Sequence, residues 1–164
     1  MRRSFVFLIS LFVAGALFAN NSSGSSGGSS SGGGGGATKV ASSTPSALDW
    51  YNRGFAASDA GKYQDAINDF QQAISLKADY AEAYNMLGFS TRKIGKVKDA
   101  FAYYEKALTL KSNFPEAREY YGEAFLQEGN LAKAVQQYII LQKAGTKNAG
   151  ELLEKIDEFV NMKS

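Results

Sequence analysis

The chain has 164 residues, with 18 basic and 16 acidic side chains and with neither cysteine nor histidine. The missing residue types exclude disulfides, thiol nucleophiles and metal sites built on thiolate or imidazole, and they remove the commonest general base near neutral pH. Without Arg2 and Arg3, which lie in a segment that we expect to be removed, basic and acidic side chains balance at 16 each, and no Lys/Arg-rich run indicates a nucleic-acid or anionic-membrane partner.

Residues 1–19 have the composition of a secretory signal peptide. Two arginines precede an uncharged apolar run of 14 residues, which is shorter than the roughly 20 residues that a helix needs to cross a bilayer. We expect cleavage after Ala19, and cleavage after Ala16 stays open because Leu17 is an imperfect match to the small residue preferred before the cut. The paired arginines also resemble a twin-arginine export signal, although the general secretory route is favoured. We predict an exported, periplasmic protein, with an extracellular location or an anchor formed by the uncleaved signal as alternatives.

The segment that follows contains almost only small polar residues. Residues 20–36 are nearly all Ser, Gly or Asn, and they end in five consecutive glycines. Such a sequence cannot bury apolar surface, so we predict a disordered Ser/Gly-rich linker over residues 20–46. The glycine run is not a phosphate-binding loop, because the Gly-Lys-Ser/Thr order is missing and no predicted strand precedes it.

From residue 47 onward the sequence repeats with a period of 34 residues. A fixed period of this length predicts pairs of helices that stack into an array. Counting from Ala47, Ala81 and Pro115 gives three units, 47–80, 81–114 and 115–148. The columns that recur are Gly54, Gly88 and Gly122; Gly61, Gly95 and Gly129; Ala66, Ala100 and Ala134; Phe70, Tyr104 and Tyr138; and Ala73, Ala107 and Leu141.

Each column has a physical reason to recur. The glycine column that begins at Gly54 lies on the first helix of each pair, where a missing side chain lets the second helix approach closely. The column that begins at Gly61 falls between the two helices, where a residue with positive φ can end the first one. The aromatic column that begins at Phe70 shares an apolar stripe on the second helix, and we expect it to lie in the core.

The starts of the first helices also carry a recurring signal. A polar residue precedes an acidic one by three positions in each unit, which is the spacing of a capping box. The three predicted pairs are Ser46 with Asp49, Asp79 with Glu82, and Asn113 with Glu116.

From Ala47 to Asn148 the recurring residues closely resemble the tetratricopeptide repeat pattern. The resemblance implies an all-α fold, a right-handed α-solenoid of three helix-turn-helix units. Arg53 and Arg118 depart from the pattern, because their columns are usually apolar or aromatic in this family. We expect snorkelling side chains or looser packing at these two positions.

A seventh helix is predicted over residues 149–163, capped by Asn148 with Glu151 three residues later. We expect this helix to cover the third unit, because an internal repeat leaves its apolar face open at the end of a stack. The alternative is that the helix docks on a partner or a membrane. Its apolar face carries Leu152, Leu153, Ile156, Phe159 and Val160.

The resemblance further implies that the first helices line a concave groove that holds an extended or helical peptide. The surface changes from aromatic through basic to acidic along the units, which favours a ligand with an apolar anchor flanked by charges. The alternative for the first unit is that its aromatic residues pack under the N-terminal segment. The carried-over site residues are Tyr51, Phe55, Asn85, Phe89, Arg92, Lys93, Glu119 and Glu123, and the further groove positions are Leu48, Ser58, Asp59, Glu82, Glu116, Leu126 and Gln127.

One subset of this family grips a C-terminal carboxylate with Lys, Asn and Arg side chains on the same helices. Among the carried-over positions of this chain, only Asn85 fits that clamp, and Glu116 and Glu119 stand near positions where cations would be needed. A carboxylate-terminated chaperone tail is therefore a poor candidate ligand.

The sequence favours an exported scaffold or adaptor that binds a peptide or protein segment, in the assembly of cell-envelope protein complexes. The alternative is a structural protein that self-associates into a homo-oligomer by stacking end to end or by swapping its last helix. An enzyme that uses Glu116, Glu119 or Glu123 as acid and base is least favoured, because nothing in the sequence encloses these carboxylates. We expect no catalytic residue, no metal, no cofactor, no nucleic acid and no membrane contact after signal cleavage.

Overall fold

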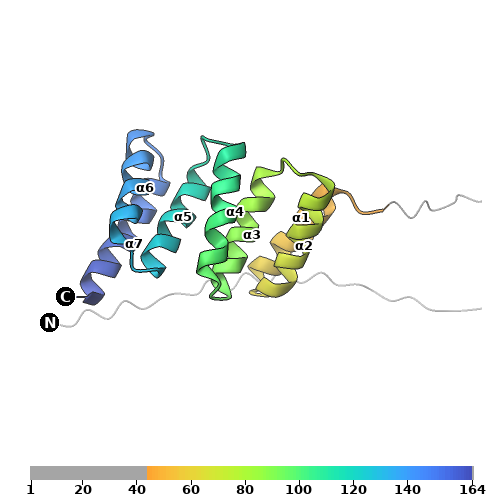
Figure 1. Ribbon diagram of the computed structural model, residues 1–164, viewed down its shortest axis with the longest axis horizontal. Coiled ribbons are helices and arrows are strands. Elements are labelled where there is room, and N and C mark those ends of the chain that lie inside the picture. The colour runs from red at the N-terminus through yellow and green to blue at the C-terminus, as the bar shows by residue number, and fades with distance from the viewer. Residues whose placement is uncertain (1–43, 164) are drawn as a thin grey trace, which may run out of the picture. The chain divides into compact units, whose positions relative to one another are not determined.

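The computed structural model describes residues 44–163, and the predicted signal peptide and nearly all of the predicted linker lie outside these residues. The described segment is all-α. It forms three helix-turn-helix units that follow one another along the array, and a final helix beside the third unit (Figure 1). The helices are α1 (Ala47–Asp59), α2 (Tyr63–Leu76), α3 (Ala81–Lys93), α4 (Val97–Leu110), α5 (Pro115–Gln127), α6 (Leu131–Lys143) and α7 (Asn148–Lys163).

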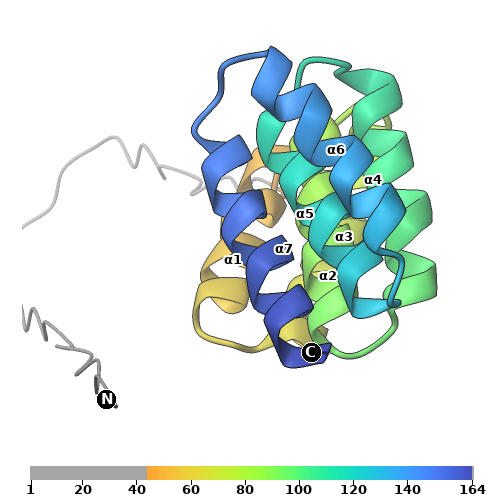
Figure 2. The same ribbon diagram turned by 90° about the vertical axis from the view of Figure 1, so that its left-hand side faces the viewer.

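The helices lie in two layers. Each second helix packs on the first helix of its own unit and on that of the next, and α7 packs on both α5 and α6. The first helices also contact one another across units, α1 with α3 and α3 with α5, whereas no such contact joins α2 to α4 or α4 to α6. Figure 2, viewed from the C-terminal end of the array, shows α7 and α1 on one side and α4 and α6 on the other. The inner surface of the array is therefore built from α1, α3 and α5.

The turns within the units are closed by glycines, as the sequence predicts. Gly61 has a φ of 73°, which is a left-handed conformation that side chains disfavour. The amide of Gly61 donates to the carbonyl of Ser58 at 3.0 Å, and the amide of Lys62 donates to the carbonyl of Ala57 at 2.8 Å. This pair of bonds is a Schellman motif. Equivalent positive-φ glycines end α3 and α5, and a fourth, not predicted from the sequence, ends α6.

The glycine and aromatic columns meet in the first two units. A Cβ atom added to Gly88 would lie 2.8 Å from Cε1 of Tyr104, and the Tyr104 ring is completely buried. Gly54 approaches Phe70 in the same way. The predicted close approach is confirmed, and the group that fills the space above the glycine is the aromatic ring.

The third unit differs from the first two. The aromatic residue of its column, Tyr138, packs against the apolar core as predicted, but it is only partly buried and does not fill the space above the glycine. The reason is that α7 supplies the side chain that faces the glycine: a Cβ added to Gly122 would lie 2.5 Å from Cδ2 of Leu152. Leu152 and Ile156 are buried against the third unit, which confirms α7 as its covering helix.

The capping box before α1 is confirmed. The amide of Asp49 donates to Oγ of Ser46 at 3.2 Å, and the amide of Ser46 donates to Oδ2 of Asp49 at 2.8 Å. The reciprocal bonds satisfy two amides that the first turn would otherwise leave free.

The capping boxes predicted at Asp79 and Asn113 are wrong. The residues before α3 and α5 are Tyr80 and Phe114, and neither cap makes a side-chain hydrogen bond. The ring of Tyr80 lies 5.1 Å from that of Tyr51, and Phe114 is buried in an apolar cluster. Burial of an aromatic ring stabilises these helix starts in place of a polar cap.

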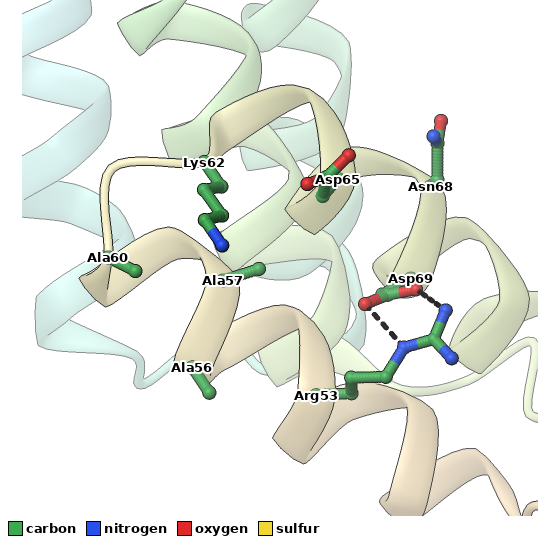
Figure 3. A pocket seen from close by; sticks show the side chains of 8 residues that line it. All are labelled: Arg53, Ala56, Ala57, Ala60, Lys62, Asp65, Asn68 and Asp69. Atoms are coloured by element: carbon green, nitrogen blue, oxygen red, sulfur yellow. Dashed lines mark hydrogen bonds and ion pairs between the residues drawn. The ribbon is translucent and has the colours of Figure 1, made fainter.

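The N-terminal end of the array is polar. Arg53 of α1 forms an ion pair with Asp69 of α2 (Figure 3). The guanidinium of Arg53 also lies 4.1 Å from the ring centroid of Trp50. This pairing replaces the expected snorkelling or loose packing at Arg53. Arg118, the other departure from the pattern, donates to the carbonyl of Ser112 at 3.2 Å.

Candidate functional site

The inner surface of the array carries a series of neighbouring aromatic rings. On α1, the ring of Tyr51 lies 6.3 Å from that of Phe55. On α3, the ring of Phe89 lies 5.0 Å from that of Tyr120 on α5 and 6.3 Å from that of Tyr63 at the start of α2. Helical spacing places Tyr51 and Phe55 on one face of α1, because residues four apart on a helix share a face, whereas the contacts of Phe89 join it to neighbouring helices. The rings therefore link all three units across one surface.

A hollow of about 300 Å³ lies among these rings. It combines aromatic and thioether side chains with the hydroxyl of one serine and one carboxylate. Its lining residues are Phe55, Ser58, Asp59, Tyr63, Met86, Phe89 and Tyr120.

Four of the eight predicted site residues lie on this aromatic surface or at its edge. Phe55 and Phe89 line the hollow itself, and Phe55 is 49% exposed. Tyr51 is half-buried beside Phe55. Lys93 is exposed, with its Nζ 5.2 Å from the centroid of the Phe89 ring.

Two further predicted residues are bound to each other. Arg92 of α3 is buried, and its Nη2 lies 2.6 Å from Oε2 of Glu123 on α5. The hydroxyl of Tyr104 is close by, and burial raises the pKa of Tyr104 well above its ordinary value. This ion pair joins the second unit to the third, since Arg92 lies on α3 and Glu123 on α5. Because the two charges neutralise each other, the pair contributes little net charge to the inner surface.

Glu119 and Asn85 lie below the surface. Glu119 is 8% exposed, and its carboxylate accepts a hydrogen bond from Nδ2 of Asn148 at the start of α7. Burial raises the pKa of Glu119 to about 7, and the neighbouring carboxylate of Glu151 adds to this rise. Asn85 is also buried, at 4% exposure. Both side chains offer little surface to a ligand in this conformation.

The sequence did not identify Tyr63, Met86 or Tyr120 as part of the surface. Tyr120 follows Glu116 by four residues and precedes Glu123 by three, so its helical spacing from these two predicted groove positions was the available signal. Tyr63 belongs to a second helix, and nothing in the repeat pattern indicates that its ring reaches across to Phe89.

Two other hollows lie away from the aromatic surface. One of about 310 Å³ is formed where α3 and α5 meet α7, and its lining includes Arg92, Leu126, Lys155 and Phe159. The other, of about 500 Å³, lies at the N-terminal end beside the Arg53–Asp69 pair and is floored by alanines of α1 (Figure 3).

Within residues 44–163, no group of three or more Asp, Glu, His or Cys side chains is arranged to hold a metal. In the same range, no helix is long and apolar enough to cross a membrane. Of the three glutamates considered as an acid–base set, Glu119 is buried and Glu123 is paired with Arg92.

Comparison with known proteins agrees with this geometry. Residues 58–91 match the model of the TPR repeat, and residues 92–149 match a model of the tetratricopeptide repeat. None of the curated proteins matches the chain.

Solved structures share the fold. The type III secretion translocator chaperone SycD of Yersinia enterocolitica is 24% identical, with a TM-score of 0.63 over 73% of this chain and 92% of that one. The second TPR domain of human RPAP3, solved in complex with the HSP70 peptide SGPTIEEVD, is 26% identical, with a TM-score of 0.60 over 68% and 94% of the two chains. MamA is 30% identical, with a TM-score of 0.53 over 71% and 62%.

Proposed function

Because the chain belongs to the tetratricopeptide repeat family, we propose that it is a scaffold or adaptor that binds a peptide or protein segment on the inner surface of α1, α3 and α5. The observation that carries the proposal is the series of aromatic rings on that surface, with Phe55 half-exposed at one end and Tyr120 at the other. Burying apolar surface contributes about 25 cal/mol per Å², and exposed aromatic patches commonly mark interaction sites.

The related human domain supports this proposal. It is similar in sequence as well as in fold, and its structure contains a bound peptide. Aromatic residues at the centre of an interface contribute a large share of binding energy, because they bury much surface at a low cost in side-chain entropy. The rings of Tyr51, Phe89 and Tyr120 lie where a segment laid across α1, α3 and α5 would cover them.

The proposed location is the cell envelope, where the chain would assemble or hold protein complexes after export. The composition of residues 1–19 motivates this part of the proposal. N-terminal sequencing of the protein recovered from a periplasmic fraction tests it: a start at residue 20 or 17 is expected. Recovery of the uncut chain in the cytoplasm alone would contradict export.

The binding surface is tested by crosslinking and capture with the full-length protein. The double variant Tyr51→Ala with Phe89→Ala should lose its captured partners while its circular dichroism stays helical. The matched control is Ile139→Ala with Ile140→Ala, which removes two exposed apolar side chains from α6, each 40% exposed. If the groove variant keeps every partner that the wild type and the control capture, the inner surface is not the binding site.

A further inference from the structure

We propose that the hollow lined by Phe55, Tyr63, Met86, Phe89 and Tyr120 takes a single basic side chain, arginine or lysine, of the bound peptide, with Asp59 as its counter-charge. This inference rests on the proposed function, and it names the residue chemistry that the groove recognises.

The shape of the hollow suits one long side chain. The ring planes of Tyr63 and Phe89 meet at 69°, and those of Phe89 and Tyr120 at 46°, so the rings form walls on more than one side. The volume of about 300 Å³ lies at the small end of the range for ligand pockets. Because the rings belong to four different helices, the hollow is held open by the packing of the array and does not depend on a loop.

Aromatic walls attract cations. The face of an aromatic ring is electron-rich, and a Lys or Arg cation within about 6 Å of the ring centroid is stabilised by it. The ring of Phe89 already makes such contacts within this chain, with Lys93 at 5.2 Å and with Arg92 at 5.6 Å. The charge of Arg92 is balanced by Glu123, so Lys93 is the cation whose repulsion an incoming basic group must overcome.

Carboxylates outnumber that single cation around the hollow. Asp59 lines the hollow and is exposed, and within residues 44–163 it forms no ion pair. Glu116 is exposed one turn before Tyr120 on α5. The pKa of Tyr120 is raised by burial and, in addition, by Glu119, Glu123 and Glu116, while Arg92, the ion-pair partner of Glu123, acts in the opposite direction.

The position of Asp59 is unfavourable for the helix that carries it. Asp59 is the last residue of α1, where the partial negative charge of the helix end disfavours a carboxylate. The equivalent residues of the second and third units are Lys93 and Gln127, neither of which is acidic. An exposed carboxylate that forms no ion pair within residues 44–163 is available to a cationic ligand at the hollow.

The methionines provide a direct measurement of occupancy. The chain has three, Met1, Met86 and Met162. Met86 lines this hollow and Met162 lines the hollow beside α7. In the full chain labelled with ¹³C-methyl methionine, blocked pentapeptides Ala-Ala-X-Ala-Ala with arginine or lysine at X should shift the Met86 methyl signal and leave the Met162 signal in place.

Neutral peptides separate charge from shape. Citrulline has nearly the shape of arginine without its charge, and norleucine offers only the aliphatic chain. We expect both to bind about fivefold or more weakly than the arginine peptide, as judged from titration of the Met86 signal. Raising the salt concentration should weaken the binding of the arginine peptide and leave the affinity for the norleucine peptide nearly unchanged.

The variant Asp59→Asn should reduce the affinity for the arginine peptide toward that for the citrulline peptide, and the remaining difference measures the contribution of the aromatic rings. It should fold at least as well as the wild type, because it removes a negative charge from a helix C-terminus. Asp157→Asn on α7 is the control, since Asp157 is equally exposed and does not line the hollow.

Equal Met86 shifts from norleucine and arginine peptides would overturn the basic preference while leaving the proposed peptide-binding function intact. A Met86 signal that no peptide shifts would also overturn the inference. In that case, loss of captured partners from the Tyr51→Ala, Phe89→Ala variant would still support the function itself.

Discussion

Arg53 and Asp69 form a two-point ion pair at the positions that Leu87 and Tyr103 occupy in the second unit. Leu87 is completely buried, and it packs against Ile67 and Phe70 of the preceding unit. The first unit has no described unit before it, and at the same place it carries a charged pair in which the Asp69 side chain is only 6% exposed. At the start of the stack, an ion pair therefore occupies the positions that form an apolar contact between units further along.

The first prediction concerns this end of the array. Replacing the pair by the residues of the second unit, Arg53→Leu with Asp69→Tyr, exposes an apolar face, and we expect the variant to self-associate. Light scattering coupled to size-exclusion chromatography at increasing concentration measures the mass. The reversed pair, Arg53→Asp with Asp69→Arg, keeps the face polar and should elute like the wild type. A variant mass that equals the wild-type mass at every concentration would contradict the role of the pair.

The second prediction concerns the approach of α3 to α4. Gly88→Ala places a Cβ against the buried ring of Tyr104, so we expect the free energy of unfolding to fall by about 1–3 kcal/mol. Gly150→Ala on α7 is the control, because nothing lies within 4 Å of an added Cβ there. That change should stabilise the protein by about 0.5–1 kcal/mol, since alanine favours a helix over glycine. Urea unfolding followed by circular dichroism compares the two, and equal effects would rule out the steric explanation.

The third prediction separates two adjacent leucines of α7. Leu152 is completely buried against Gly122, whereas Leu153 is 37% exposed. Leu152→Ala should cost about 2–5 kcal/mol of unfolding free energy because it opens a cavity, and it should increase hydrogen exchange throughout α7. Leu153→Ala should cost less than about 1 kcal/mol. If the two variants unfold at the same urea concentration, α7 does not pack as described.

The fourth prediction concerns pH. The pKa of Glu119 in the folded chain is about 7, above its ordinary value of 4.5. Folding therefore takes up a proton between these two values, so the stability that this group contributes is complete below about pH 4.5 and is lost as pH rises through 7. Allowing for the partial solvation of this carboxyl, we expect the unfolding free energy to fall by about 1–2 kcal/mol from pH 5 to pH 8.

The variant Glu119→Gln isolates this effect. Its amide can still accept from Asn148 and has no charge to bury, so the stability of the variant should vary less between pH 5 and pH 8 than that of the wild type. Glu128→Gln, on the exposed residue that ends α5, is the control and should keep the wild-type profile. Parallel profiles for the wild type and Glu119→Gln would show that Glu119 is not the titrating group.

Regular features of the repeat were predictable from sequence because each satisfies a local requirement. Gly61 supplies the positive φ that ends α1, and Phe70 fills the space above Gly54. Both structural requirements recur every 34 residues, so the glycines and aromatic residues that meet them recur in the sequence with the same period. The stacked helix pairs follow from the same periodicity, whereas α7 was predicted from its apolar face and from the open end that a last repeat leaves.

Features that depend on contacts between units were harder to predict. Glu119 occupies a groove position carried over from the family, but its side chain is buried and accepts a hydrogen bond from Asn148 of α7. Tyr120 was not predicted as a groove residue, because it lies between the positions carried over from the family. Its ring nevertheless lies next to that of Phe89. The position of a residue within the repeat predicts the helix face on which it lies. Whether its side chain is buried depends on how the neighbouring helix packs against that face.

The two ends of the array set how many ligands one molecule can hold. An ion pair stands where a preceding unit would stack, and α7 occupies the place of a following one. We therefore expect the inner surface to keep a fixed length, without extension by further copies of the chain stacking at either end. We expect a stoichiometry of one bound segment per chain, so any gain from multivalency has to come from tethering several chains together or from a partner that carries several segments.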